Sequence, residues 1–400
     1  MSGDAERCPR MALKGQASVR SALLLERRFT PMQAANALYS DGSGAAPEAI
    51  VTSLSRQVFD AGLPQPSSRL RRLLAAVTLR ILKKTTRTEV RTGQDDKDVI
   101  SYRNRVLERS NHPYVLTLLR PSDADSATFV EGGDPMNAPY MMLLPEIRQN
   151  AAVWDRLLLD SVIGRDVQLR FVWETKITHE MASRRLNQGE SVRLKAAAAG
   201  TGLSLIVVYD RLIREGHDPR LISATITDRA AANVTKARRL LRTLPTTQNN
   251  PAKDGKDFGI SAQIEDLFEH RSSGDEEPHI VTLVGILEYF HGFTFTTTEE
   301  SLGHSAVSGE EDAEMVLRKI GAMTAESGTL IANSYRTETG ARLLEVFGKR
   351  FRYRNREHLH ALVETAGFVP TGIVGSGHIY DVEAFEKRPT SRSDASNGES

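Results

Sequence analysis

The half of the chain after Gln188 alternates short runs rich in β-branched residues with longer amphipathic runs. The short runs predict strands at 192–197, 221–227, 258–264, 280–284, 329–333, 370–373 and 378–382. The longer runs predict helices at 203–215, 230–244, 311–323 and 356–366. Because helices connect the strands of parallel sheets, this alternation predicts an α/β fold with a mostly parallel sheet and helices on both of its faces.

The residues before this half have a largely helical pattern. Two stretches, at 50–62 and 70–81, each place apolar residues on one helical face. The many glycines and prolines at 121–148 indicate an irregular connection or lid. A helix or helix pair, interrupted near Gly164, is expected at 151–186.

These patterns divide the chain into a helical N-terminal cap at 19–150 and the α/β domain at 151–385. The segments at 1–18 and 387–400 are polar and contain few large apolar residues, so we expect them to be disordered.

The composition disfavours several classes of protein. A net charge of +1 argues against a general nucleic-acid binder, and the basic residues around 70–81 are interpreted as a solvated helix face. Cys8 is the only cysteine, which leaves no internal disulfide and no cysteine-based zinc cluster. His358 and His360 face different directions on one expected helix, so we expect no metal site. With no apolar run near about 20 residues, we expect a cytoplasmic protein without a membrane span.

The loop AAAAGTG at 196–202 joins the first expected strand to the helix that follows it. Small residues at such a turn let the backbone approach a ligand closely. Ligands of open α/β sheets bind beyond the carboxyl ends of the strands, which is where this loop is expected to lie. The third glycine of G-x-G-x-x-G is missing, so a pyrophosphate cradle is not supported.

A carboxylate ends the next expected strand. Asp228 follows Gly202 by 26 residues, and an acidic side chain at about this spacing accepts hydrogen bonds from a ribose diol. The alternative role is capping of the helix that follows, because Asp is a favoured residue at helix N-termini.

Two more signals follow at later strand ends. Gln263 and Ile264 end the third expected strand, and the run GILEYF at 285–290 follows the fourth. With these signals in strand–helix order, residues 150–385 resemble a class I S-adenosylmethionine-dependent methyltransferase. The resemblance implies a Rossmann-like domain with S-adenosylmethionine as its cofactor. It implies these cofactor-binding residues: Ala198, Gly200, Thr201, Gly202, Asp228, Arg229, Gln263, Ile264 and Gly285.

The sequence departs from the pattern of that family at several positions. Ala196 and Ala198 stand where the family has an acidic residue and its first glycine, and Gln263 and His279 stand where it often has Asp. Another group is then needed to support the methionine end of the cofactor. Candidates lie on the helix before the first strand, where packing is the alternative role for each: Arg170, Trp173, Glu174 and Lys176.

Polar residues past the fourth and fifth strands are candidates for chemistry. A base is needed only if the acceptor arrives protonated, and Glu288 or His291 could serve, with Tyr289 as a wall of the pocket. The residues expected to contact the substrate are Asn333, Tyr335, Arg170 and Trp173.

The leading hypothesis is methyl transfer to a small-molecule acceptor. A second hypothesis is attack on another sulfonium carbon, giving aminocarboxypropyl transfer or cyclisation of the cofactor side chain to a small ring amino acid, with release of methylthioadenosine. A third is a non-catalytic binding or scaffold protein that keeps the fold. Nothing in the sequence indicates an oligomeric state.

Overall fold

The computed structural model describes residues 31–39, 45–62, 133–151, 156, 159, 162–248, 259–268, 277–289, 309–336 and 354–389. Within these ranges no helix is both long enough and apolar enough to cross a membrane.

One seven-stranded sheet forms the centre of the molecule, with the strand order β3-β2-β1-β4-β5-β7-β6. Its strands are β1 (Val192–Ala196), β2 (Ile222–Asp228), β3 (Gly259–Ile264), β4 (Ile280–Leu283), β5 (Thr329–Tyr335), β6 (Phe368–Ser376) and β7 (Tyr380–Lys387). The five strands from β3 to β5 are parallel, whereas β7 is antiparallel to both β5 and β6. Every expected strand is present, so the prediction of a mostly parallel, Rossmann-like sheet is confirmed.

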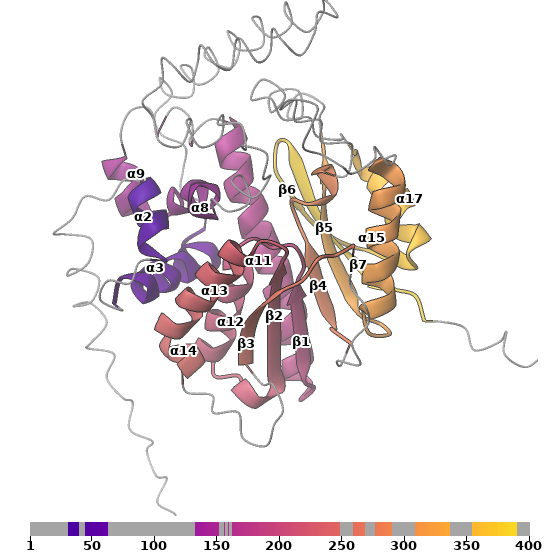
Figure 1. Cartoon of the computed structure of the whole chain (residues 1–400), viewed down its shortest axis with the longest axis horizontal. Helices are drawn as coiled ribbons and strands as arrows, with labels where there is room; N and C mark the ends of the chain where they lie inside the picture. Colours follow the sequence, from indigo (N-terminus) through magenta and orange to yellow (C-terminus); the bar gives the residue numbers. More distant parts are fainter. Residues whose placement is uncertain are drawn as a thin grey trace, which may run out of the picture.

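Helices cover both faces of this sheet (Figure 1). One face carries α11 (Val162–Asn187), α12 (Leu203–Arg214), α13 (Ala231–Thr243) and the short α14 (Pro245–Gln248), and the other carries α15 (Gly309–Met323) and α17 (Arg356–Thr365). Consecutive residues of β5 separate the two cores: Ile331 belongs to the cluster under α11 and α12, while Leu330 and Ala332 belong to the cluster under α15 and α17. This alternation follows from the two-residue side-chain period of a strand.

Helices from the N-terminal region pack on the α11 and α12 side. They are α2 (Pro31–Ala37), α3 (Ala45–Arg56) with the π-helical turn η1 (Gln57–Ala61), α8 (Gly133–Met141) and α9 (Pro145–Asn150). Leu38 just after α2, Leu54 of α3 and Met141 of α8 share one apolar cluster with the sheet. The described N-terminal helices are therefore part of the same core as the α/β domain.

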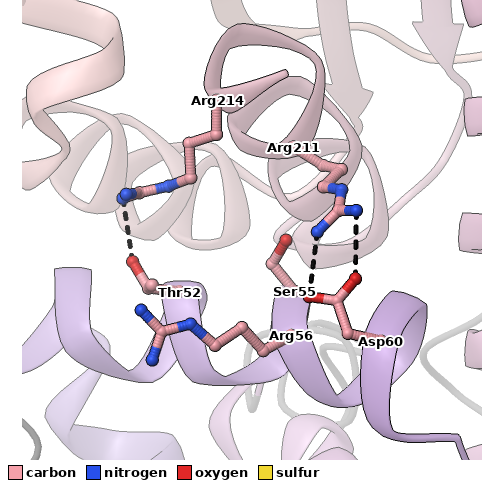
Figure 2. Close-up of a pocket in the computed structure, with 6 residues that line it drawn as sticks. All are labelled: Thr52, Ser55, Arg56, Asp60, Arg211 and Arg214. Carbon is pink, nitrogen blue, oxygen red and sulfur yellow. Dashed lines mark hydrogen bonds and ion pairs between the residues drawn. The ribbon is translucent and has the colours of Figure 1, made fainter. Parts of the chain in front are cut away.

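Ion pairs fasten α3 and η1 to α12 around a hollow of about 330 Å³ (Figure 2). Arg211 pairs with Asp60 at 3.0 Å, and Arg214 donates a hydrogen bond to the Thr52 hydroxyl at 2.9 Å. Each arginine also pairs with an acidic residue of its own segment, Arg211 with Glu215 and Arg214 with the buried Asp210. These contacts make the hollow a seam between α3, η1 and α12.

One prediction about the region before the sheet is wrong. The irregular connection was expected at 121–148, of which residues 121–132 lie outside the described part of the chain, whereas residues 133–141 and 145–148 belong to α8 and α9. Pro145 occupies the first turn of α9, where its missing N–H costs nothing, and α8 contains Pro139. Of the helix or helix pair expected at 151–186, α11 begins at Val162, two residues before the interruption expected near Gly164, and it buries Phe171, Val172 and Ile177.

The ends of the chain need one smaller correction. Lys387, expected to begin the disordered tail, is the last residue of β7, and the backbone of Arg388 donates to the Gly367 carbonyl. The helix expected at 70–81 and the segments at 1–18 and 390–400 lie outside the described residues.

Candidate functional site

The loop after β1 lies where the strand order reverses. The chain leaves β1 toward β2 on one side, while β4 flanks β1 on the other, and ligands of open α/β sheets bind at such a switch point. The loop is attached to both neighbouring strands: the Ala197 amide donates to the Thr282 carbonyl on β4, and the Ala199 amide donates to the Thr227 carbonyl on β2, both at 2.9 Å. These hydrogen bonds hold the loop backbone in one position between the strands.

Three residues of the loop have left-handed backbone conformations. Gly200 and Gly202 have φ values of 60° and 62°, and Ala198 has 49°. A side chain at Gly202 would also place its Cβ within 2.8 Å of Ile226 side-chain atoms, so glycine is required there for two reasons. Ala198, which replaces the first glycine of the family pattern, adopts the conformation that glycine favours.

Asp228 joins the end of β2 to this loop. Its Oδ2 accepts a hydrogen bond from the Gly200 amide at 2.7 Å, and its Oδ1 accepts from the Ala230 amide at 2.8 Å and from Asn233 Nδ2 at 3.2 Å. Burial raises the pKa of this carboxyl, against the Ala230 and Gly200 amides, which favour the charged form. A carboxylate has about four acceptor positions, so three are occupied and one remains for a ligand hydroxyl. The N-cap residue of α13 (Ala231–Thr243) is Ala230, so Asp228 fastens the loop and the turn before this helix and does not cap the helix itself. Ribose binding stays a prediction.

Thr201 connects the loop to the N-terminal helices. The Tyr39 hydroxyl, just after α2, donates to Thr201 Oγ1 at 2.8 Å, and Asn137 Nδ2 of α8 donates to the same atom at 3.1 Å. Asn137 also donates to the Tyr39 hydroxyl at 2.5 Å, and all three residues are at most 5% exposed. Sequence reasoning missed Tyr39 and Asn137, because nothing local links residues 64 and 162 positions away from Thr201.

The end of β3 presents an exposed apolar side chain. Ile264 is 58% exposed, and Gln263 beside it is also exposed. The next residue, Glu265, is held by Lys195 of β1 through an ion pair of 2.8 Å. Arg229, expected to bind the cofactor, is exposed just after β2. These side chains line the β3 edge of the same switch point.

A buried polar group occupies the β4 edge. The Gly285 amide donates to Asn333 Oδ1 at 2.6 Å, which ties the end of β4 to the end of β5. The Arg170 guanidinium of α11 lies against Gly285 and pairs with Glu288 at 3.1 Å. It also stacks over the ring of Tyr380 at 5.0 Å. Sequence reasoning named Arg170, Glu288 and Asn333 separately, and the structure brings them together.

Two tyrosines close this group from β5 and β7. The rings of Tyr335 and Tyr380 lie 4.9 Å apart, and both residues are buried. Burial raises the pKa of Tyr380 to about 12, against the attraction of Arg170. Both hydroxyls are therefore protonated at neutral pH and can act as hydrogen-bond donors.

Glu174 lies one helical turn beyond Arg170, on the loop side. Its Oε1 accepts a hydrogen bond of 2.7 Å from Ser204 Oγ at the start of α12, and its carboxylate also bonds to Thr282 of β4. Burial raises the pKa of Glu174 to about 7, against these hydrogen bonds and the attraction of Arg170. Thr282 is the register partner of Ala196, so this carboxylate lies beside the position where the family has its first-loop acid.

The other candidates lie elsewhere or outside the described residues. Trp173 packs against Gly375 of β6 and donates to the Ser376 carbonyl at 3.2 Å, which is a packing role. Tyr289 ends the short helical turn η3 (Leu287–Tyr289), but its side chain is outside the described residues, as is all of His291.

No protein-family model and no curated protein matches the chain. Solved structures do match. Magnesium protoporphyrin IX methyltransferase from Synechocystis PCC 6803, with bound SAH, is 12% identical and is matched over 55% of this chain and 87% of its own, with a TM-score of 0.36. Human N-acetylserotonin methyltransferase, in complex with SAM, is 12% identical over 74% of this chain and 68% of its own, with a TM-score of 0.39. N-methyltransferase NodS from Bradyrhizobium japonicum WM9, in complex with SAH, is 14% identical over 54% and 87%, with a TM-score of 0.34. At such low identity the likeness concerns the fold.

Proposed function

We propose that this chain is an S-adenosylmethionine-dependent methyltransferase that acts on a small-molecule acceptor. The observation that carries the proposal is the contact between Gly200 and Asp228 at 2.7 Å, at the point where the strand order reverses. This contact joins the glycine loop and the acidic end of the second strand, which are the two parts that a ribose-binding site needs.

The sheet favours a nucleoside ligand over a dinucleotide. Dinucleotide-binding sheets combine two parallel halves, in the order 3-2-1-4-5-6. Here the first half is present, but β7 is inserted beside β5 and runs antiparallel to it. The loop also lacks the third glycine that helps to hold a pyrophosphate. Both features favour a ligand with one nucleoside.

The residues present fit the parts of S-adenosylmethionine. A Cβ at Gly200 would meet only Asn233, at 4.0 Å, so the backbone there is open to a ligand. Asp228 keeps one acceptor position for a ribose hydroxyl. Ile264 offers an exposed apolar surface on which a base can pack, next to the amide of Gln263.

The bound cofactor supplies an electrophilic methyl group on a sulfonium, and the thioether that remains after transfer is the leaving group. The protein must then hold the acceptor in line with that methyl group. Asn333 is 4% exposed, and its Nδ2 donates to no group among the described residues, so it is placed to orient a polar acceptor. Glu288, fixed by Arg170, supplies a carboxylate at the same strand edge to take a proton from the acceptor.

A small acceptor fits the way in which the N-terminal helices are attached. Tyr39 and Asn137 bind the loop itself through Thr201, which places helices α2 and α8 beside the cofactor position. Helices so close to the loop leave a confined space for the acceptor.

Calorimetry with the full chain tests cofactor binding. We expect S-adenosylmethionine and S-adenosylhomocysteine to bind, and absence of binding at millimolar concentration would refute the proposal. Ile264→Asp should weaken binding without changing the melting temperature, because the side chain is 58% exposed. Met315→Asp is the matched control: Met315 is 38% exposed on α15, on the other face of the sheet.

Product analysis tests the chemistry. The protein is incubated with methyl-labelled S-adenosylmethionine and a small-molecule extract of cells, and the products are separated by mass spectrometry. Formation of S-adenosylhomocysteine with label in a small molecule supports methyl transfer. Release of methylthioadenosine would instead show attack on another sulfonium carbon, and binding without turnover over a range of extracts would favour a scaffold.

A further inference from the structure

Glu174 is a partly buried carboxylate without a cationic partner in the described part of the chain. Its hydrogen-bond partners are two hydroxyls, those of Ser204 and Thr282. Arg170 attracts it from one turn away, but the Arg170 guanidinium forms its ion pair with Glu288. A carboxylate withdrawn from water is costly unless a positive charge compensates it. Glu174 must therefore either keep a proton or meet a cation, and among the described residues it forms no ion pair.

The position of Glu174 shows where that cation would come from. Ser204 is the second residue of α12, directly after the loop, and Thr282 pairs with Ala196 at the end of β1. Ala196 packs in the same apolar cluster as Phe171 and Val172 of α11, so its side chain lies on the face of the sheet from which Glu174 approaches. The carboxylate is thus placed beside the loop, on the opposite side of β1 from Asp228.

We propose that Glu174 binds the positively charged amino group at the amino-acid end of the ligand, in the place that a carboxylate at position 196 would otherwise fill. This inference rests on the proposed function, because it assumes a ligand that carries a nucleoside at one end and an amino acid at the other. Asp228 and Ile264 would then hold the nucleoside end, and α11 would supply the charge for the other end.

The test combines one substitution with two ligands. S-adenosylhomocysteine contains the amino-acid end, whereas methylthioadenosine contains the same thioether nucleoside without it. Glu174→Gln keeps the size of the side chain and removes its charge. Since a charged hydrogen bond contributes about 1.5–3 kcal/mol, we expect the Kd for S-adenosylhomocysteine to rise about 10- to 100-fold. The Kd for methylthioadenosine should change less than about 2-fold.

A stability measurement provides a second readout, because the substitution that weakens ligand binding should raise the melting temperature. The pKa of Glu174 is raised from 4.5 to about 7, so the folded protein keeps this proton where the unfolded chain has lost it. The contribution to stability is therefore present below pH 4.5 and is lost as the pH rises through 7. The titratable groups that face Glu174 are Arg170 and Tyr140, and neither is altered in the variant. We expect Glu174→Gln to melt at a higher temperature than the wild type at pH 8, and not at pH 4.5.

The control is Glu180→Gln, on the exposed side of the same helix, which should change neither Kd. A variant at Glu174 that weakens both ligands equally, or neither, would overturn the inference and leave the proposed function standing. Failure of the wild type to bind either ligand would refute both. Weaker binding of S-adenosylhomocysteine alone, in a protein that is more stable at pH 8, is the result that supports direct contact with the amino group.

Discussion

Ala198 is the residue of the loop at which a substitution should stabilise the protein. Its φ of 49° is left-handed, and this conformation costs a residue with a Cβ about 1–2 kcal/mol. Glycine removes that cost but gives the unfolded chain more freedom, which offsets about 0.4–1 kcal/mol. We therefore expect Ala198→Gly to raise the free energy of unfolding by about 0.8 kcal/mol, the difference between the middle values of these ranges. In a domain of this size, that corresponds to a rise of roughly 2–3 °C in Tm.

Ala196 provides the matched control, two residues earlier at the end of β1. It does not have a positive φ, and its side chain is fully buried in the core. Ala196→Gly adds the same freedom to the unfolded chain, relieves no strain and removes a packed methyl group, so it should lower the free energy of unfolding by about 1 kcal/mol.

Urea denaturation followed by circular dichroism measures both variants, with thermal melts as a check. Equal m-values would show that the difference lies in stability and not in the extent of unfolding. If Ala198→Gly destabilises the protein as much as Ala196→Gly does, Ala198 is not left-handed and the argument about the loop fails.

Three further predictions concern the packing around the site. Gly375→Ala should destabilise the protein by about 3 kcal/mol or more, because the new Cβ would lie 2.2 Å from the ring of Trp173. Urea denaturation measures the change in the free energy of unfolding, and a smaller loss would mean that the ring can move. Burial lowers the pKa of His279 from 6.5 to about 4, so the contribution of this residue to stability is present above pH 6.5 and is lost as the pH falls through about 4. His279→Gln should therefore flatten the decline of Tm over that pH window, and an unchanged slope of Tm against pH would contradict the assignment. Tyr39→Phe removes the hydroxyl that donates to Thr201, and should weaken S-adenosylhomocysteine binding several-fold by loosening the loop; an unchanged Kd in a folded variant would show that the N-terminal helices do not position it.

The strands and helices of the α/β half follow closely from the local pattern. The expected strand at 192–197 is β1 at Val192–Ala196, and the expected helix at 203–215 is α12 at Leu203–Arg214. These elements are predictable because a buried strand or an amphipathic helix repeats its apolar residues at a period that can be read within a few residues. The same reasoning failed at 133–148, where proline density concealed two helices that tertiary packing stabilises.

The candidate site was predictable only in its parts. The loop, Asp228, Gly285 and Asn333 could be named because each follows a strand, and the carboxyl ends of parallel strands meet at one edge of a sheet. Arg170 and Glu174 could be named only as members of a charged helix. Which of them pairs with Glu288, and which meets Ser204 and Thr282, depends on how α11 lies on the sheet.

The class of fold and the position of the loop follow from the amino-acid sequence alone, because strand ends and small residues are local properties. The hydrogen bonds of Tyr39 and Asn137 to Thr201, and the carboxylate of α11 beside Ala196, are visible only in the folded protein. The physical reason is that a hydrogen bond or an ion pair depends on distance in space. Helix packing sets that distance between residues far apart in the chain, and no local period encodes it.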